Sequence, residues 1–371
     1  MNPSKPFRFL LTRLTEDYLL LALVLSLLPL LWFTSPELNE LVELVHWQTL
    51  AALTGFLVLS RGLEDSGALA LAGVWLVARF RTERALALAL VGFSMVLSAV
   101  VTNDVTLFIV VPLTVALSSV VKIPLGRLVI FQALAVNVGS ALTPIGNPQN
   151  LFIWQTWELG FIEFVSAMLP LVLLLSLSLG LATALAFPSR PVRVSLVARL
   201  AKPRLLLVSG LLYPAFILAA EAGGVIAAAL VILVLYGLVY RSVLRGVDWL
   251  LLLVFLLMFV NLGLLATLPA AHAFVEWLLA MPGGVLTASV LMSQVMSNVP
   301  AAIFLAPFTD DWQALAWGVS VGGFGLAIGS LANLIALRLA RVQGLWLAFH
   351  VWSMPALALG VLSAVFLIGP G

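Results

Sequence analysis

The feature that most constrains the fold of this chain is a series of long apolar segments separated by short polar loops. A helix needs about 20 mostly apolar residues to cross the hydrocarbon core of a bilayer. About nine segments approach this length, namely 17–33, 45–60, 127–158, 161–187, 204–221, 223–240, 247–268, 313–341 and 344–369. Because only helices and closed barrels satisfy their backbone groups in lipid, these lengths predict an all-α membrane protein.

Composition supports a membrane location. Hydrophobic residues make up 63% of the 371 residues, and charged residues make up 9%. Soluble domains carry about 25% charged residues, so this chain cannot cover itself with a water-facing surface, and we expect a lipid bilayer around it. The net charge of +2 is too small to indicate nucleic-acid binding. The chain has no cysteine, and no nucleophile–base pair, phosphate loop or metal motif stands out, which argues against an enzyme and against a bound cofactor.

Two further apolar stretches, 85–121 and 283–308, are each interrupted near the middle by polar residues and a proline. Basic residues flank the first stretch on both sides, and they are Arg79, Arg81, Arg84, Lys122 and Arg127. Since basic loops stay in the cytoplasm, we predict that this stretch enters and leaves there, as a re-entrant hairpin with its tip near Thr102. Asp310 and Asp311 follow the second stretch, which predicts a hairpin that enters from the outside.

The remaining loop charges orient the chain. Basic residues gather in alternate loops, and they are Lys5, Arg8, Arg13, Arg190, Arg193, Arg199, Lys202, Arg204, Arg241, Arg245, Arg338 and Arg341. Acidic residues such as Glu37, Glu163 and Glu221 lie in the loops between them. This pattern predicts a multi-pass protein of the cell inner (cytoplasmic) membrane with its N-terminus in the cytoplasm and its C-terminus outside.

Two pairs of similar segments occur in the same order along the chain. Leu97–Asp104 resembles Met292–Val299 at a separation of 195 residues, and Gly139–Leu151 resembles Gly322–Leu334 at a separation of 183 residues. Each pair lies where we predict a helix break. Because the two hairpins are predicted to enter from opposite faces, the repeats are inverted in topology. Inverted repeats with broken helices are a recurring design of secondary transporters.

This repeat divides the chain into two halves. The predicted units are 1–187 for the first inverted repeat, 188–222 for a linker loop and a linking helix, and 223–371 for the second inverted repeat. The hairpin and the broken helix of each repeat are 85–121 and 127–158 in the first half, and 283–308 and 313–341 in the second half.

Asn103 and Asn298 are the sharpest candidates for a binding role. Each lies deep in an apolar stretch, beside a hydroxyl residue and a predicted helix break. Carbonyl groups freed at a break, together with an Asn oxygen, can coordinate Na⁺, and Ser98 or Ser293 one turn earlier can add a ligand. Helix N-termini at the same break offer N–H groups to an anion. A single Asn could simply cap a broken helix, but the duplication of the pair favours function.

The second predicted break, at Gly146–Asn150, carries three amide side chains within four residues. Each of these side chains needs a polar partner at membrane depth, which argues against an ordinary kink. The corresponding break near Gly329 is less polar. Asp104 is the only acidic residue well inside the first hairpin, where it could carry a proton or complete a cation site. Val299 stands at the matching position, so any such role belongs to the first half.

These residues resemble the ion transporter superfamily, which includes divalent anion:sodium symporters, citrate carriers, arsenite efflux permeases and a class of sodium/proton antiporters. The Ser-Asn-Thr hairpin signature of that group is similar to Thr102-Asn103-Asp104 and Ser297-Asn298-Val299 here. The helix-break motif of the group is similar to Thr143–Asn150, and the resemblance covers roughly residues 50–345.

The resemblance implies two sodium sites, a substrate site between the hairpin tips, elevator-like movement of the hairpin domain and a homodimer. Carried onto this chain, the coupling-ion residues are Ser98, Asn103, Gly146, Ser293, Asn298 and Gly329, with Asp104 as a further candidate. The substrate-binding residues are Thr102, Asn103, Asn147, Asn150, Ser297 and Asn298.

The first functional hypothesis is a secondary active transporter for a small anion, either a dicarboxylate or an inorganic oxyanion such as arsenite, coupled to Na⁺ or H⁺. Neither hairpin has the full signature, which weakens a dicarboxylate assignment, and Asn103-Asp104 is more similar to the arsenite-permease branch, where proton coupling is expected. The alternative is a Na⁺/H⁺ antiporter that uses Asp104. A non-transporting structural membrane protein is a second alternative, but a buried Asn without a ligand is costly.

Overall fold

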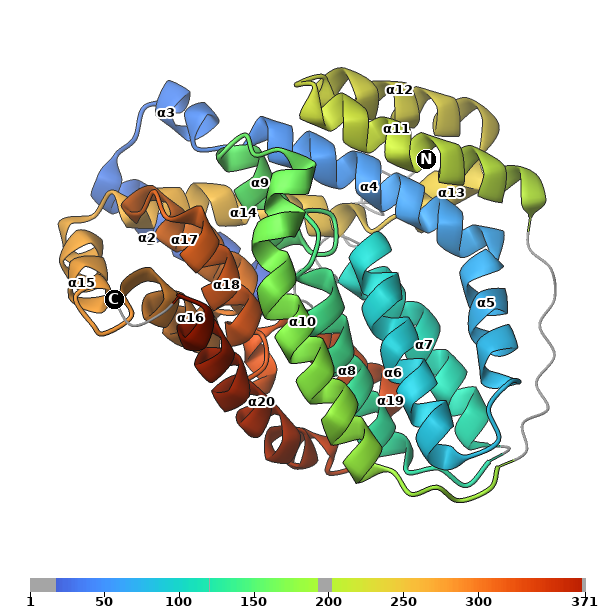
Figure 1. Cartoon of the computed structure of the whole chain (residues 1–371). Coiled ribbons are helices and arrows are strands. Elements are labelled where there is room, and N and C mark those ends of the chain that lie inside the picture. The colour runs from blue at the N-terminus through green and yellow to red at the C-terminus, as the bar shows by residue number, and fades with distance from the viewer. Residues whose placement is uncertain (1–17, 120, 193–201, 369–371) are drawn as a thin grey trace.

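The computed structural model describes residues 18–119, 121–192 and 202–368. Within these ranges the protein is helical, and the single β-type pairing is an isolated bridge between Thr82 and Pro191. This arrangement confirms the predicted all-α class (Figure 1). The basic N-terminal segment and the loop residues Arg193 and Arg199, which we used to predict orientation, lie outside the described ranges.

The helices of the first half, in chain order, are α2 (Tyr18–Thr34), α3 (Leu38–Glu43), α4 (Trp47–Ser66), α5 (Ala68–Val77), α6 (Glu83–Val100), α7 (Asn103–Ser118), α8 (Leu125–Ser140), α9 (Pro148–Thr156) and α10 (Phe161–Ala186). The remaining helices are α11 (Pro203–Glu221), α12 (Val225–Val239), α13 (Arg241–Gly246), α14 (Trp249–Ala266), α15 (Pro269–Leu279), α16 (Gly284–Met296), α17 (Asn298–Leu305), α18 (Trp312–Gly322), α19 (Leu331–Ala340) and α20 (Leu345–Ile368). Short 3₁₀ turns occupy Ala306–Phe308 and Ala327–Gly329.

Fewer helices are long enough to cross a membrane than the nine segments suggest. In the described ranges six helical segments have the required length and hydropathy, and they are Leu38–Ser66, Glu83–Val100, Phe161–Ala186, Pro203–Glu221, Trp249–Ala266 and Leu345–Ile368. The pair α15 and α16, bent by 118°, would make a seventh if it forms one span. The difference arises because α12 is shorter, and because the predicted spans 127–158 and 313–341 are each divided at a break. Of the predicted span 17–33, α2 begins at the first residue that the structure describes.

Both predicted hairpins are interrupted at the expected residues. The first consists of α6 and α7, which pack side by side and are separated only by Val101 and Thr102 (Figure 1). The second consists of α16 and α17, which also pack against each other, with Ser297 between them at a φ of 74°. A positive φ is rare for a residue with a side chain, so Ser297 marks a sharp local change of direction in the backbone.

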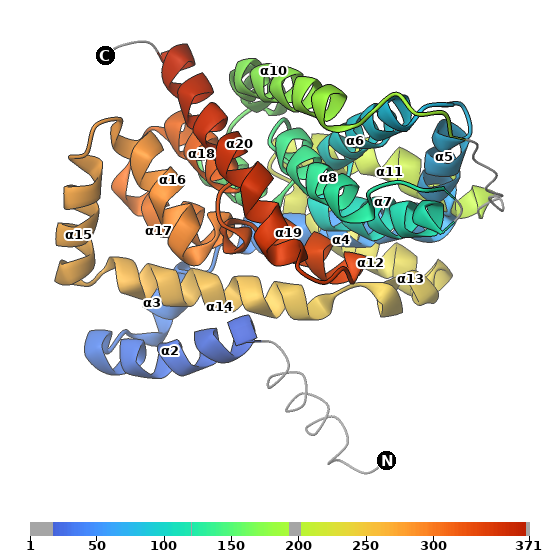
Figure 2. The ribbon, with the colours of Figure 1, turned by 90° about the horizontal axis from the view of Figure 1, so that it is seen from below.

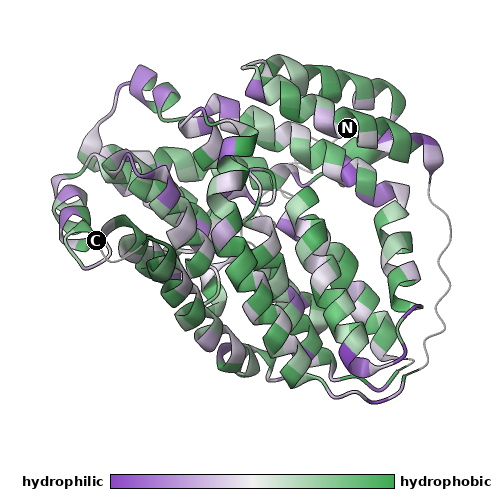
Figure 3. Ribbon diagram, viewed as in Figure 1, coloured by the Kyte–Doolittle hydropathy of each residue, from purple (hydrophilic) through white to green (hydrophobic). Residues whose placement is uncertain are grey.

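The two broken helices lie inside the protein. α8 packs against α6, α7, α10, α19 and α20, and every residue from Leu128 to Ser140 is buried. α18 packs against α16, and its last eight residues are buried. The outer helices instead expose many large apolar side chains, and Figure 3 shows the most hydrophilic residues mainly at helix ends and loops. Apolar exteriors with buried helix breaks are what a lipid solvent requires.

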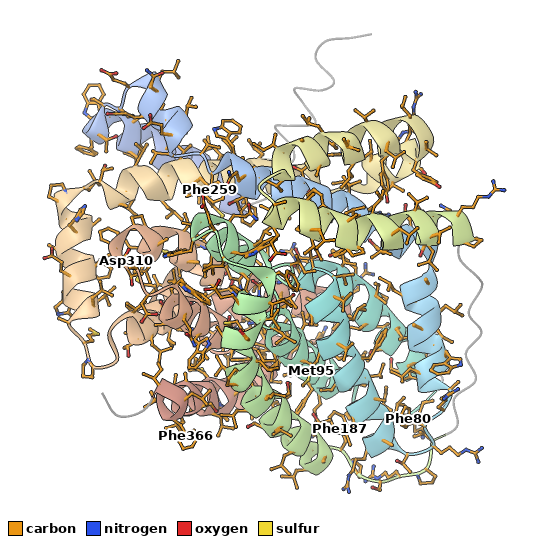
Figure 4. All side chains as sticks on the ribbon, turned by 45° about the horizontal axis from the view of Figure 1, so that its top comes forward. Phe80, Met95, Phe187, Phe259, Asp310 and Phe366 are labelled. Carbon is orange, nitrogen blue, oxygen red and sulfur yellow. The ribbon has the colours of Figure 1, made fainter. Side chains whose placement is uncertain are left out.

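Two groups of helices can be distinguished by their packing. The frame helices are α2, α4, α11, α12 and α14: α11 and α12 pack on α4, while α2 packs along α14 (Figure 2). The bundle helices are α6 to α10 and α16 to α20. The bundle contacts the frame through α9 and α7 on α4, and through α17 on α14. At this boundary His46, which precedes α4, packs against Phe152 of α9 and Phe259 of α14 (Figure 4).

Candidate functional site

The tip of the first hairpin is joined to the break between α8 and α9. The backbone N–H of Asn103 donates to the carbonyl oxygen of Gly146 at 2.8 Å, and the Thr143 hydroxyl donates to the carbonyl oxygen of Ala99 at 2.8 Å. Ser98 lies against Gly139, where an added Cβ would collide with the Ser98 hydroxyl. Ser98, Asn103 and Gly146, the three residues predicted for the first coupling-ion site, therefore lie close together in the structure.

The hairpin tip itself is buried and polar. The Oδ1 atom of Asn103 accepts the N–H of Asp104 at 2.9 Å, and the carbonyl of Thr102 accepts both the N–H and the hydroxyl of Thr106. The Thr102 hydroxyl oxygen is buried and has no hydrogen-bond partner among the described residues. A buried polar atom without a partner is unusual in a native structure. Thr102 therefore retains hydrogen-bonding capacity for a ligand.

Asn147 and Asn150 are turned toward their own helix break. The Asn147 amide nitrogen donates to the carbonyl of Ser140 at 3.0 Å, while its oxygen caps α9 by accepting the N–H of Asn150 at 2.9 Å. The Asn150 amide nitrogen lies 3.2 Å from the carbonyl oxygens of Ser140, Ala141 and Thr143. These donors satisfy carbonyls that α8 leaves unpaired at its end. Of the polar atoms of these two side chains, the oxygen of Asn150 is the one that is buried without a partner among the described residues.

The second hairpin meets the second break in a similar way. Ser293 lies against Gly322, where an added Cβ would be 2.6 Å from the Ser293 hydroxyl oxygen. This contact repeats that of Ser98 with Gly139. The Ser297 hydroxyl lies 3.4 Å from the Oδ1 atom of Asn298. Gly329 lies close to the Gly322 carbonyl, at 2.8 Å from the position of an added Cβ. The predicted residues of the second coupling-ion site thus also lie around one break.

Asn137, which sequence reasoning missed, connects the two halves. This residue of α8 donates to the Oδ1 atom of Asn333 at 2.8 Å and accepts the hydroxyl of Ser330 at 3.0 Å. Asn333 in turn donates to the carbonyl of Gly323 at 2.8 Å. An Asn near the end of a largely apolar segment was the available signal, since such a side chain needs polar partners. Its partners in the other half were not apparent from the sequence.

Three further side chains form hydrogen bonds to the backbone of the second helix break. Gln294 donates to the carbonyl of Gly322 at 2.6 Å and accepts the N–H of Leu326 at 2.7 Å, and the Ser353 hydroxyl donates to the carbonyl of Gly325 at 2.7 Å. His350 accepts the N–H of Ala327 through Nε2 at 3.2 Å, while its Nδ1 lies 2.8 Å from the carbonyl of Trp346. The two contacts together require a neutral imidazole with the proton on Nδ1.

Asp104 lies at the boundary between the bundle and the frame. It lines a cavity of about 10 Å³ together with Thr102, Asn147 and the frame residues Leu53 and Leu251. That volume is about the space of one water molecule. The ion pairs of the described residues join Arg61 to Glu64 and to Asp65, so the Asp104 carboxylate has no cationic partner within them. Asp104 is therefore a half-buried, unpaired carboxylate beside the hairpin tip.

Comparison with known proteins identifies the family. A sequence model of a citrate transporter family matches residues 10–322. The chain belongs to this citrate transporter family. It is 43% identical over 317 residues to the inner membrane protein YbiR of Escherichia coli, covering 84% of this chain and 85% of the relative. An uncharacterized transporter of Methanocaldococcus jannaschii is 30% identical over 307 residues, covering 81% and 83%.

A solved structure shares the fold. The crystal structure of the Alcanivorax borkumensis YdaH transporter aligns with a TM-score of 0.56 at 17% identity, over 95% of this chain and 98% of that chain. The family, the relatives and the apolar helices together make this chain a multi-pass inner membrane transporter of the citrate or anion permease type, and not an enzyme. The resemblance to the ion transporter superfamily is confirmed, and the alternative of a non-transporting structural protein is set aside.

Proposed function

We propose that the protein is a secondary active transporter that moves a small anion, either a dicarboxylate or an inorganic oxyanion such as arsenite, with Na⁺ or H⁺ as coupling ion. The observation that carries this proposal is the repeated arrangement of a hairpin against a helix break. In both halves a hairpin serine lies on a glycine of the broken helix, as Ser98 on Gly139 and as Ser293 on Gly322. Asn103 and Asn298 begin the second arm of each hairpin.

The helix ends at these breaks carry complementary partial charges. Four helices, α7, α9, α17 and α19, begin there, and their N-termini present N–H groups that favour an anion. The ends of α6, α8, α16 and α18 present carbonyl oxygens, which suit a hard cation such as Na⁺. The buried Asn103 and Asn298 add side-chain oxygens beside those carbonyls. One site of this kind therefore suits an anion and a coupling cation together.

The order of helices supports two inverted repeats with the boundaries 1–187, 188–222 and 223–371. The series from α4 to α10 matches the series from α14 to α20 in order: two helices, a hairpin, a broken helix and a long final helix. The final helices, α10 and α20, have 26 and 24 residues. The same proposal puts the basic helix ends in the cytoplasm, with the N-terminus inside and the C-terminus outside. A homodimer is part of the same proposal.

Alternating access by movement of the bundle against the frame fits the geometry. The cavity beside Thr102 and Asp104 holds about one water molecule, so a larger anion enters only if the bundle moves. The frame presents apolar side chains to this cavity, namely Leu53, Phe56, Leu57 and Leu251. Apolar surfaces slide without breaking directional bonds, which supports an elevator-type motion of the hairpin tips along α4 and α14.

Asp104 supports a second candidate function, Na⁺/H⁺ exchange. Its carboxylate has no cationic partner among the described residues and lies at the boundary where the bundle would move. An unpaired carboxylate at membrane depth can exchange a proton for a cation. In the anion-transport proposal the same residue carries the coupling proton.

Uptake into proteoliposomes separates these proposals. Purified protein is tested with citrate, succinate and arsenite under imposed Na⁺, pH or voltage gradients. We expect uptake of one anion that is abolished by Asn103→Ala and by Asn298→Ala. The matched control is Asn261→Ala, which removes a buried Asn of the frame helix α14 that bonds to Ser26 and Leu257. Na⁺/H⁺ exchange without movement of any anion, lost in Asp104→Asn, would replace the first proposal with the second.

A further inference from the structure

A second cavity lies between α8, α10 and α20. Its volume is about 220 Å³, and it is lined by Phe131, Leu134, Val138, Leu175, Ser178, Leu179, Ala182, Phe324, Val351, Trp352, Pro355, Ala356 and Leu359. Ser178 is the one hydroxyl side chain in this lining, and it donates to the carbonyl of Leu174 at 2.8 Å. The lining of the cavity is therefore predominantly apolar, and an occupant presents mainly apolar groups to it. Apolar cavities of roughly 150 Å³ stay dry and bind apolar guests.

The cavity opens toward the lipid-facing side of the bundle. Its walls α10 and α20 pack against each other and against α8, and Figures 1 and 2 show both on the outside of the bundle. Leu359 and Val351, which line the cavity, are 48% and 66% exposed. The outer face of α10 exposes further leucines, namely Leu173, Leu177 and Leu181. A guest thus enters sideways from the hydrocarbon region and not from water.

An arginine side chain lies at one end of this cavity. Arg127 lies on α8 one turn before the lining residue Phe131, and its guanidinium carbon is 5.9 Å from the ring centre of the lining residue Trp352. Its Nη1 atom donates to the carbonyl of Ala186, at the end of α10, at 2.8 Å. The side chain is exposed and has no carboxylate partner among the described residues. A guanidinium has five N–H donors in all, so Arg127 can also bind an anion.

A second arginine reinforces the positive charge at this end. Arg84 donates through Nε to the carbonyl of Phe187 at 2.9 Å, next to the residue that Arg127 contacts (Figure 4). α8 also begins here, at Leu125, and its N-terminus adds positive partial charge. An apolar cavity with a cationic end matches a molecule that has an apolar chain and an anionic head.

We propose that this cavity binds one anionic phospholipid, with an acyl chain between α8, α10 and α20 and the phosphate on Arg127. The occupant would also support the proposed transport site. Phe324 and Val138 line the cavity, and each directly follows a residue of the network across the halves, Gly323 and Asn137. An acyl chain packed against Phe324 would therefore stabilise the second helix break. The lipid site itself does not depend on the identity of the transported ion.

The test measures lipid binding and not transport, so its outcome is independent of the proposed function. Delipidated protein is titrated with phosphatidylglycerol or with phosphatidylcholine of the same chains, and bound lipid is counted by native mass spectrometry alongside thermal unfolding. We expect preferential retention of one phosphatidylglycerol and a higher melting temperature with it. Arg127→Gln should weaken this binding roughly tenfold, as expected for loss of a charged hydrogen bond. The control Arg245→Gln, an exposed arginine of α13, should not.

Two cavity-filling variants test the position of the chain from opposite walls. Ala182→Leu on α10 and Ala356→Leu on α20 each place extra methyl groups in the cavity. We expect either variant to lose the bound phosphatidylglycerol while keeping a cooperative unfolding transition. Equal retention of the two lipids by the wild-type protein overturns the proposal without any variant. Equal losses for Arg127→Gln and Arg245→Gln, or full retention in a folded filling variant, overturn it as well.

Discussion

The N–H of Asn103 is hydrogen-bonded to the carbonyl oxygen of Gly146 at 2.8 Å, so the first hairpin and the first broken helix are connected through their backbones. Because the connection uses no side chain, substitution of Asn103 leaves it in place. Loss of transport in an Asn103 variant would therefore report on ligand binding, while the approach of the two segments depends on the small residues that surround them.

The glycines of the broken helices should not tolerate a methyl group. Gly139→Ala places a Cβ against the carbonyl of Met95, which cannot move away as a side chain could. We expect the free energy of unfolding to fall by about 1–3 kcal/mol, as for other overpacked sites, measured by thermal unfolding in detergent. Gly180→Ala on α10, with no atom within 4 Å of the added methyl, is the control and should be neutral or stabilising.

The corresponding glycine of the second half allows a rescue experiment. Gly322→Ala should destabilise the protein because its methyl meets the side chain of Ser293. Since the two nearest atoms belong to the Ser293 side chain, and the Val290 carbonyl at 3.2 Å remains, the double variant Gly322→Ala with Ser293→Gly should recover part of the lost melting temperature. A double variant as unstable as Gly322→Ala alone would show that the serine contact is not the cause.

The effects of substituting Asn137 and Asn333 on the free energy of unfolding should not be additive. Either alanine substitution leaves buried polar partners unsatisfied, which costs about 1–3 kcal/mol, and also removes support from the break at Gly323. We expect Asn137→Ala with Asn333→Ala to cost much less than the sum of the single variants. Unfolding of all three variants in the same detergent gives the interaction energy, and strict additivity would contradict the network.

Asp104→Asn should remove proton dependence from transport without unfolding the protein, because the carboxylate has no ion pair among the described residues to lose. Uptake is measured at several external pH values with the membrane potential clamped. Asp311→Asn is the control, since Asp311 caps α18 at the surface and Asn caps equally well. Unchanged pH dependence in Asp104→Asn would exclude this residue as the proton carrier.

The proposed movement of bundle against frame can be arrested chemically, since the chain contains no natural cysteine. Leu57→Cys on α4 and Ile145→Cys at the first break line the same small cavity. A short bifunctional maleimide across this pair should stop uptake. The control pair Ser26→Cys and Asn261→Cys joins the frame helices α2 and α14, whose side chains already meet at 2.8 Å, and its cross-link should leave uptake intact. Normal uptake with the first pair fully cross-linked would refute the movement.

The helix breaks could be predicted from the sequence because they depend on local chemistry. Polar residues, glycines and prolines in apolar segments mark Thr102, Gly146, Ser297 and Gly329, and their recurrence at two fixed separations added support. The number of uninterrupted spans was less accessible, because a few residues decide whether a helix is long enough: α12 has 15 residues and falls just short of the predicted span 223–240.

Side-chain direction at the site could not be predicted in the same way. The sequence suggested that Asn147 and Asn150 face a substrate, whereas the structure turns their amide nitrogens to the carbonyls of α8. The spacing of three residues that lets Asn147 cap α9 was visible, but the carbonyls of the preceding helix come close only in the folded chain. Asn137 was missed for the same reason, because its partners lie almost two hundred residues away.

The position of Asn137 has a thermodynamic consequence for coupling. A side chain from the first broken helix completes the hydrogen bonding of the second, so any ligand that shifts one break changes the free energy of the other. By reciprocity, occupancy of the second proposed site would then alter affinity at the first by the same factor. In the proposed transporter, this single amide is a direct route by which binding at one break influences binding at the other.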